Sequence, residues 1–86
     1  MGQLDLFPTD LHLTRIDPSR NRYRYYSLSV QRTLFNEWVL VREWGRIGRG
    51  GRLRHDLYPC AGRALDALRE IARSKARRGY RMCHPE

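Results

Sequence analysis

The chain has 86 residues, with 17 Lys or Arg against 9 Asp or Glu and a formal net charge of +8. A chain of this length forms one domain with a modest core, in which about 60–65% of the unfolded surface is buried. No apolar run approaches the ~18 residues of a membrane span, and no basic segment followed by an apolar run marks a secretory signal. We therefore expect one cytoplasmic domain with no membrane partner.

The positive charge is concentrated in the middle of the chain. Residues 15–54 contain ten Arg against three carboxylates, for a charge of +7, whereas residues 1–14 carry −2 and residues 55–86 carry +3. A localised charge of this kind attracts a polyanion at long range. The middle segment is therefore the candidate binding region.

Cys60 and Cys83 are the only cysteines, and they have no CxxC spacing. In a chain without a secretory signal, two such cysteines are expected to stay reduced. His84 follows Cys83, but His12 and His55 are isolated, so the sequence predicts no metal site and no cofactor.

Taken in chain order, residues 1–13 are interpreted as an N-terminal arm that leads into a first strand, which runs from Leu11 to a turn at Asp17-Pro18-Ser19. The segment 23–31 alternates, with Tyr26, Leu28 and Val30 on one face, and predicts a half-buried second strand. The third strand, residues 37–47, is apolar on both faces near its start, as a central strand covered from both sides would be. Residues 82–86 form a tail, which leaves 14–81 as the domain proper.

A glycine-rich turn follows the third strand. Glycines at 48, 50 and 51 are expected to supply positive φ angles for a tight reversal, and strand-like residues resume at Leu53 and end at Pro59. The hairpin carries Trp44, Arg46, Arg49, Arg52 and Arg54. A flat aromatic ring beside guanidinium groups suits phosphate and nucleotide recognition, and the alternative is a core tryptophan beside a solvated turn.

One helix is expected after the hairpin. Its apolar stripe has i, i+3, i+4, i+7 spacing and contains Ala61, Ala64, Leu65, Leu68, Ile71, Ala72 and Lys75. Gly79 follows a basic last turn, as expected at a helix C-terminus, and Tyr80 is predicted to pack back onto the sheet. Arg69, Arg73 and Arg77 line the outer face, either as a solvated surface or as a phosphate-facing stripe.

These elements predict an α+β domain, in which an antiparallel sheet of about four strands has one C-terminal helix packed on it. The sequence contains no nucleophile elbow, no pair of carboxylates placed for acid–base catalysis and no phosphate-binding loop followed by a helix. We therefore predict that the protein is not an enzyme.

The segment Trp44-Gly45-Arg46-Ile47-Gly48 resembles the signature of the WGR domain, a module of DNA-damage-dependent poly(ADP-ribose) polymerases and of small stand-alone bacterial proteins. The resemblance runs from about Thr14 to Tyr80. Asn21-Arg22-Tyr23-Arg24-Tyr25-Tyr26 is similar to the family's Asn-x-Asn-Lys-Phe-Tyr strand opening, and Lys75-Ala76-Arg77-Arg78-Gly79-Tyr80 is similar to its Lys-x-x-Lys-Gly-Tyr close. Trp38 and Gly51 also stand where the family has an aromatic residue and a glycine.

The resemblance implies a nucleic-acid-binding domain in which Trp44 packs against a sugar near a strand end, while Arg46, Asn21 and Arg24 contact the backbone or a neighbouring domain. Tyr23 replaces the family's second Asn, Arg24 replaces its Lys, and Arg52 replaces a Gln. Together with the hairpin arginines, the candidate nucleic-acid-binding residues are Trp44, Arg46, Asn21, Arg24, Arg49 and Arg52.

For each candidate, a purely structural role stays open at this point. Trp44 could belong to the core, Arg46 could pair with Glu43 or Asp56, Asn21 could cap the turn after Pro18, and Arg49 and Arg52 could be solvated turn residues.

The first functional prediction is a non-catalytic module that binds DNA without reading its sequence, with ends or nicks as the candidate preferred sites. The first alternative is an adaptor that docks a protein partner through the same Trp and Arg face, since these residues are common interface anchors. The second alternative is RNA binding, in which part of the set Tyr23, Tyr25 and Tyr26 stacks on unpaired bases. Tyr25 and Tyr26 fall on opposite faces of the strand, so the three cannot all stack together. Whether the chain dimerises is not determined by its sequence.

Overall fold

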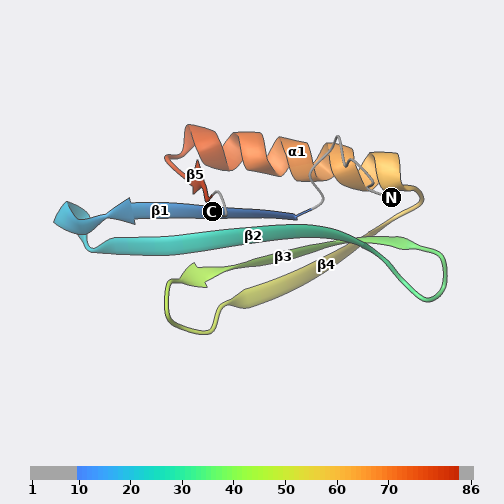
Figure 1. Ribbon diagram of the computed structural model, residues 1–86, viewed down its shortest axis with the longest axis horizontal. Helices are drawn as coiled ribbons and strands as arrows, with labels where there is room; N and C mark the ends of the chain where they lie inside the picture. Colours follow the sequence, from blue (N-terminus) through green and yellow to red (C-terminus); the bar gives the residue numbers. More distant parts are fainter. Residues whose placement is uncertain (1–9, 84–86) are drawn as a thin grey trace, which may run out of the picture.

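The computed structural model describes residues 10–83. In chain order its elements are β1 (Asp10–Asp17), the 3-10 turn η1 (Pro18–Arg20), β2 (Arg22–Arg32), β3 (Trp38–Arg46), β4 (Arg52–Tyr58), α1 (Ala61–Arg77) and β5 (Arg81–Met82). The strands form one antiparallel sheet in the order β4-β3-β2-β1-β5, and α1 lies along one face of it (Figure 1). The predicted α+β fold is therefore confirmed, with one strand more than expected.

The additional strand, β5, was not predicted because it has only two residues. Leu13 of β1 pairs with Met82, and Thr14 pairs with Arg81. The chain returns to the sheet edge directly after the helix, so β5 covers part of the outer edge of β1. Residues 1–9 of the predicted N-terminal arm and residues 84–86 of the tail lie outside the described residues.

The core lies between α1 and one face of the sheet. Its buried side chains are Leu13, Tyr26, Leu28, Val30, Leu40, Ala64 and Leu68. The predicted alternation in β2 is confirmed, because Tyr26, Leu28 and Val30 all face the helix, and the predicted stripe of α1 supplies Ala64 and Leu68. Burial of these apolar groups is the main term that holds the helix on the sheet.

The expectation that β3 is covered from both sides was wrong. In the described part of the chain only α1 packs on the sheet, so Leu40 is fully buried while Val39 and Val41 are half-buried on the opposite face. Val39 and Val41 pair across the sheet with Leu57 and His55 of β4. Cross-strand contacts between apolar neighbours on a pleated surface account for these valines without a second covering layer.

The helix ends as its sequence predicts. The Tyr80 amide donates to the Lys75 carbonyl at 3.0 Å, and the Gly79 amide donates to the Ala76 carbonyl at 3.1 Å. This is a Schellman motif, in which Gly79 has a φ of 99°. The Tyr80 ring then packs edge-on against Tyr26, with centroids 6.3 Å apart, which confirms its predicted return to the sheet.

The turn between β3 and β4 needs its glycines for two different reasons. Gly48 has a positive φ of 87°, and the Arg49 amide closes the turn on the Arg46 carbonyl at 3.0 Å. The expectation that Gly50 and Gly51 also have positive φ was wrong. At Gly51 the neighbouring chain comes too close for a side chain, because a Cβ would overlap the Trp44 carbonyl oxygen and the Tyr25 hydroxyl.

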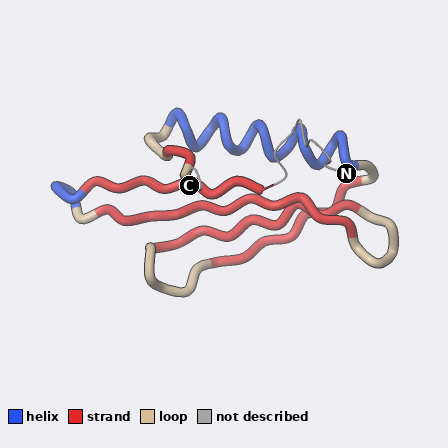
Figure 2. The backbone as a smooth tube through the Cα atoms, viewed as in Figure 1, coloured by secondary structure: helices blue, strands red, loops and turns tan. Residues whose placement is uncertain are grey.

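The β1–β2 hairpin extends past the C-terminal end of α1 (Figures 1 and 2). The helix therefore covers only part of the sheet face on its own side. The uncovered part of that face begins next to Gly79, where Arg15 approaches the end of the helix. A Cβ atom added to Gly79 would lie 3.2 Å from the Nε atom of Arg15.

Candidate nucleic-acid interface

Three arginines lie in a row across the uncovered end of the helix-side face. Arg15 of β1 is directly opposite Arg24 of β2, and Arg24 is directly opposite Arg46 of β3. Directly opposite side chains leave the same face of a sheet, so in this arginine row three cationic side chains start from adjacent positions. Like charges at directly opposite positions repel one another, so the arginine row destabilises the free protein.

Trp44 lies in the next row toward the helix. Its indole stacks on the Tyr26 ring, with centroids 5.6 Å apart and an interplanar angle of 13°. Trp44 packs against the buried cluster but stays half-buried, and Arg52 of β4 lies directly opposite on its other side. The indole is therefore fixed by the core on one side and bordered by guanidinium groups on the other.

Arg46 and Asn21 contact each other directly. The Arg46 guanidinium donates to the backbone carbonyl of Asn21 and to its side-chain oxygen, each at 3.2 Å, and lies 5.3 Å from the centroid of the Tyr23 ring. Arg46 thus holds the tip of the β1–β2 hairpin instead of pairing with Glu43 or Asp56. Asn21 has a left-handed backbone, with a φ of 55°, and its side chain accepts from Arg46.

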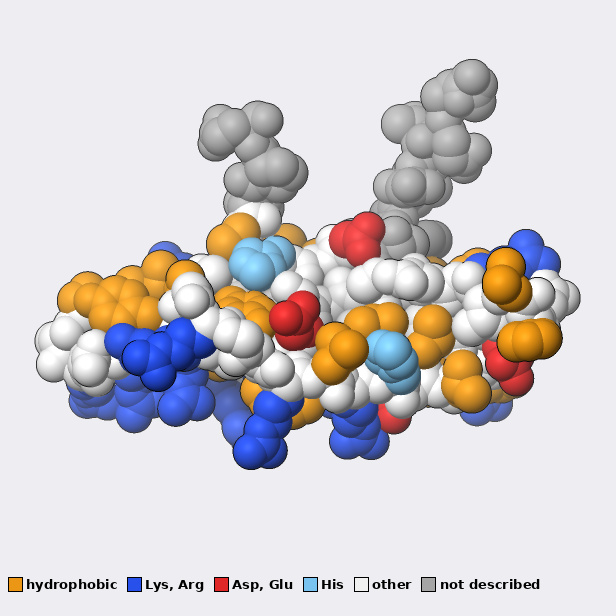
Figure 3. Space-filling model, turned by 90° about the horizontal axis from the view of Figure 1, so that it is seen from below, with side chains coloured by type: hydrophobic (Ala, Val, Ile, Leu, Met, Phe, Trp, Pro, Cys, Tyr) orange, Lys and Arg blue, Asp and Glu red, His pale blue; other side chains and the backbone are white. Residues whose placement is uncertain are grey.

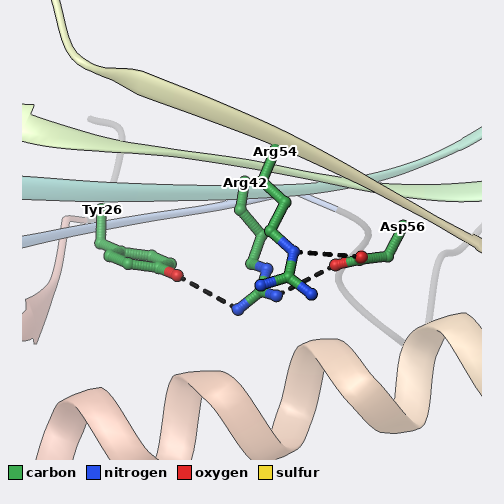
Figure 4. Close-up of polar contacts among 4 residues, drawn as sticks. All are labelled: Tyr26, Arg42, Arg54 and Asp56. Atoms are coloured by element: carbon green, nitrogen blue, oxygen red, sulfur yellow. Dashed lines mark hydrogen bonds and ion pairs between the residues drawn. The ribbon is translucent and has the colours of Figure 1, made fainter.

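A partly buried ion pair lies between the sheet and the helix. Arg42 of β3 donates to Asp56 of β4 at 3.0 Å and to the Tyr26 hydroxyl at 3.5 Å, and Arg54 donates to the other oxygen of Asp56 at 3.1 Å (Figure 4). Burial acts to lower the pKa of Arg42, but its hydrogen bonds to Asp56 and Tyr26 outweigh burial and raise it. The side chains of all four residues point toward α1 (Figure 4).

The pKa of Asp56 shifts the opposite way. Burial acts to raise it, but hydrogen bonds from Arg42 and Arg54 outweigh that effect and lower it. The carboxylate on this part of the helix-side face is therefore already engaged by two guanidinium groups. It does not neutralise the arginine row, which lies three rows further along the strands on the same face.

Lys75, the one lysine of the chain, lies next to the rings of Tyr26 and Tyr80. Its Nζ atom is 4.5 Å from the centroid of Tyr26 and 5.8 Å from that of Tyr80. Burial lowers the pKa of Lys75, and the nearby positive charges of Arg78 and Arg42 lower it further. The helix end thus adds cationic groups next to the face that carries Trp44.

The opposite face of the sheet has a different character. Apolar and uncharged side chains occupy most of its middle, and Lys and Arg lie mainly toward its margins (Figure 3). The ring of His12 stacks on Tyr25 with centroids 6.0 Å apart, its Nδ1 atom is 2.7 Å from the Ser27 hydroxyl, and the Tyr25 hydroxyl donates to Glu43 at 3.0 Å.

The structure brings most of the sequence-derived candidates together and leaves one apart. Arg24, Arg46 and Arg52 lie on the helix-side face with Trp44, and Asn21 joins them through Arg46. Arg49 instead lines a shallow hollow of the opposite face with His12 and Tyr25. We use the name basic surface for Trp44 with its surrounding cations: Arg15, Arg24, Arg42, Arg46, Arg52, Arg54 and Lys75.

The candidate residues derived from the sequence did not include Arg15, Arg42, Lys75 or Arg54, although Arg54 was placed on the hairpin. A signal for the first two was present, because Arg42 and Trp44 share a face by strand alternation and Arg15 shares one with Leu13. Alternation within one strand does not fix the register in which it pairs with its neighbour. The residues that share a face across several strands therefore cannot be assigned from each strand alone.

Between residues 10 and 83, no three His, Cys, Asp or Glu side chains gather closely enough to hold a metal ion. Cys60 and Cys83 are both exposed and unbridged. Among the described helices, none has the length and apolar character to cross a membrane.

The described residues thus form a small antiparallel sheet with one helix, a half-buried tryptophan and a cluster of cations on the helix-side face. The chain belongs to the WGR domain family, whose model matches residues 9–85. It is 42% identical over 77 residues to the uncharacterized protein y4dW of Sinorhizobium fredii, a match that covers 86% of this chain and 36% of that protein. The chain thus spans about a third of the length of this relative. No solved structure is significantly similar to it.

Proposed function

We propose that the protein is a non-catalytic module that binds DNA through the basic surface without reading base sequence. The observation that carries the proposal is the arginine row, Arg15–Arg24–Arg46, next to the outer side of Trp44. Phosphate contacts by guanidinium groups supply affinity and orientation without base specificity. A bound polyanion would also remove the repulsion within the row, because each phosphate lies between positive groups.

The position of Trp44 supports a preference for strand ends or nicks. Tyr26 occupies one face of the indole, so at most one face and an edge are available to a ligand. Such a half-covered ring can pack against a terminal sugar or base, where no following nucleotide is in the way. Arg46 and Asn21 fix the neighbouring hairpin tip, which makes the surface rigid before binding.

The binding experiment is a titration of labelled duplex DNA at several salt concentrations. With about five phosphate contacts, the slope of log K against log salt is expected near −4 to −5. Matched linear duplexes with and without a 5′-phosphate, compared with a closed circle, measure the preference for ends. Absence of binding at low salt refutes the proposal, and equal affinity for the linear and circular forms refutes the end preference.

Two tryptophans of one strand provide an internal control. Trp38 lies on the same face of β3 as Trp44 but six residues away, close to Tyr58 and beneath the Arg32 guanidinium at 5.9 Å. In the Trp38→Phe variant all tryptophan emission comes from Trp44, so it is expected to change when DNA binds. In the Trp44→Phe variant the remaining emission from Trp38 is expected to stay constant while end binding weakens.

The geometry favours duplex DNA over stacking on single-stranded RNA. Tyr26 is buried, the Tyr25 ring already stacks on His12, and Tyr23 is covered by Arg46. The three tyrosines therefore form no common platform for unpaired bases. The preference for duplex DNA is tested by displacing bound labelled duplex with a single-stranded RNA of equal length. If the RNA displaces the label more strongly than unlabelled duplex does, RNA is the preferred ligand.

A further inference from the structure

The β4 strand forms one edge of the sheet, and no described residue pairs with its outer side. The strand has seven residues, Arg52–Tyr58, without an internal proline or glycine. Its apolar residues on the open face, Leu53 and Leu57, are each 61% exposed. Protein edges are commonly protected by bulges, prolines or a covering segment, so a regular edge with exposed leucines is a template for another strand.

The sequence of β4 is complementary to itself when two copies run antiparallel. A two-fold axis through His55 places Leu53 opposite Leu57 of the second copy and Leu57 opposite its Leu53. On the helix-side face the same register places Arg54 opposite Asp56 of the second copy, twice by symmetry. Apolar and opposite-charge pairs at directly opposite positions both stabilise antiparallel strands.

In the neighbouring symmetric registers no leucine of β4 lies opposite a leucine of the second copy. Moving the axis by one residue would place Arg54 opposite Arg54, or Asp56 opposite Asp56, at the centre of the pairing. Like charges in that position are destabilising. A symmetric pair must use the same surface on both copies, so the register through His55 is the one that β4 supports.

We propose that the outer edge of β4 is a self-association surface, through which two copies join their sheets in the register centred on His55. The two helices and the two basic surfaces then lie on the same side of a continuous sheet, since directly opposite residues share a face. Pairing of one seven-residue edge is a small interface, so the dimer is weak and concentration-dependent. The pairing does not depend on nucleic-acid binding.

The first test measures the mass of the protein alone by sedimentation equilibrium over a wide concentration range. The buffer contains about 0.15 M salt, at which the Debye length is about 8 Å and repulsion between the two basic chains is reduced. The expected result is a reversible shift from 10.3 kDa toward twice that mass. A mass that stays at 10.3 kDa up to the highest soluble concentration overturns the proposal.

The second test uses two variants that should associate only with each other. Leu53→Glu and Leu57→Lys each place a charge opposite a leucine in a homodimer, so dissociation of each homodimer is expected to rise at least tenfold. In the mixture Glu at 53 meets Lys at 57, while the other two positions still pair Leu with Leu. An equimolar mixture is therefore expected to form heterodimers at concentrations where each variant alone is monomeric.

The matched control is Leu34→Glu, which makes the same chemical change at a fully exposed leucine of the loop before β3. This control is expected to dimerise like the wild type. Both test positions are exposed, so thermal unfolding should show little change and monomeric behaviour will not reflect loss of fold. Failure of the mixture to associate, or dissociation of the control, overturns the edge pairing in favour of contact through another surface.

Discussion

Replacing Arg24 by Gln is expected to stabilise the free protein while it weakens binding to DNA. Arg24 is exposed and lies directly between Arg15 and Arg46 on the same face of the sheet. Glutamine keeps part of the aliphatic side chain and removes the charge. Because the two neighbours repel Arg24 in the free state, loss of its charge relieves both interactions at once.

The magnitude follows from Coulomb's law. Two unit charges in water repel by about 1 kcal/mol at 4 Å and by less at a larger separation. Arg24 has two positively charged neighbours, one directly opposite on each side. Screening by salt reduces the sum, so Arg24→Gln should raise the free energy of unfolding by about 0.5–1 kcal/mol at low salt. For a domain of this size the melting temperature should rise by roughly 2–8 °C.

Thermal unfolding at low and high salt measures the stability, and the DNA titration measures the binding. The stabilisation is expected to shrink at high salt, and the salt slope of binding should fall by about 0.9, the contribution of one phosphate contact. The control Arg73→Gln removes the same charge from the exposed outer face of α1. Lower stability in Arg24→Gln, or an equal loss of binding in the control, would refute the reasoning about the arginine row.

Three further predictions concern the scaffold of the basic surface. Gly51→Ala should destabilise the fold by about 1–3 kcal/mol in chemical denaturation, because its Cβ overlaps the backbone of Trp44, whereas Gly50→Ala, which meets no atom within 4 Å, should change little. Asp56→Asn should cost about 1–3 kcal/mol near neutral pH, because Arg42 keeps its partly buried position without a carboxylate. Because the pKa of Asp56 is lowered in the folded protein, its carboxylate contributes stability above about pH 4, the unfolded pKa. This contribution is lost as the pH falls through the folded pKa. In Asp56→Asn the free energy of unfolding should therefore depend less on pH in the acid range than in the wild type.

Two outcomes would contradict these predictions. Equal stability of the Gly51 and Gly50 variants would mean that the turn moves to accept a side chain. The same acid dependence in Asp56→Asn and in the wild type would assign that dependence to other carboxylates. These measurements use the protein without DNA, so they test the scaffold independently of its proposed function.

Local patterns in the sequence were sufficient for the four longer strands, the helix and the fold class, but not for the two-residue β5. Alternation in β2 and the apolar stripe of α1 each identify a buried face within one segment, and both were confirmed. Gly79, which follows the basic end of the helix, was expected to end it, and it does so as a left-handed residue in a Schellman motif. In such cases the periodicity and the residue type are the cause of the local structure.

The composition of the basic surface depends on contacts between strands. The sequence identified Trp44 and its nearest arginines, yet it placed Arg49 with them and left out Arg15, Arg42, Arg54 and Lys75. Arg49 lies on the other face because the turn reverses the chain around Gly48, while Arg15 joins through the pairing of β1 with β2. Residues far apart in sequence become neighbours only once strand order and register are fixed.

The sequence by itself thus determined an α+β domain of the WGR family, with its positive charge in the middle of the chain. The tertiary structure decided which cations share one face, which side of Trp44 is covered by Tyr26, and which sheet edge is left unpaired. The reason is that periodicity is a property of one segment, whereas register, strand order and the place where a helix ends relative to a hairpin are properties of several segments packed together.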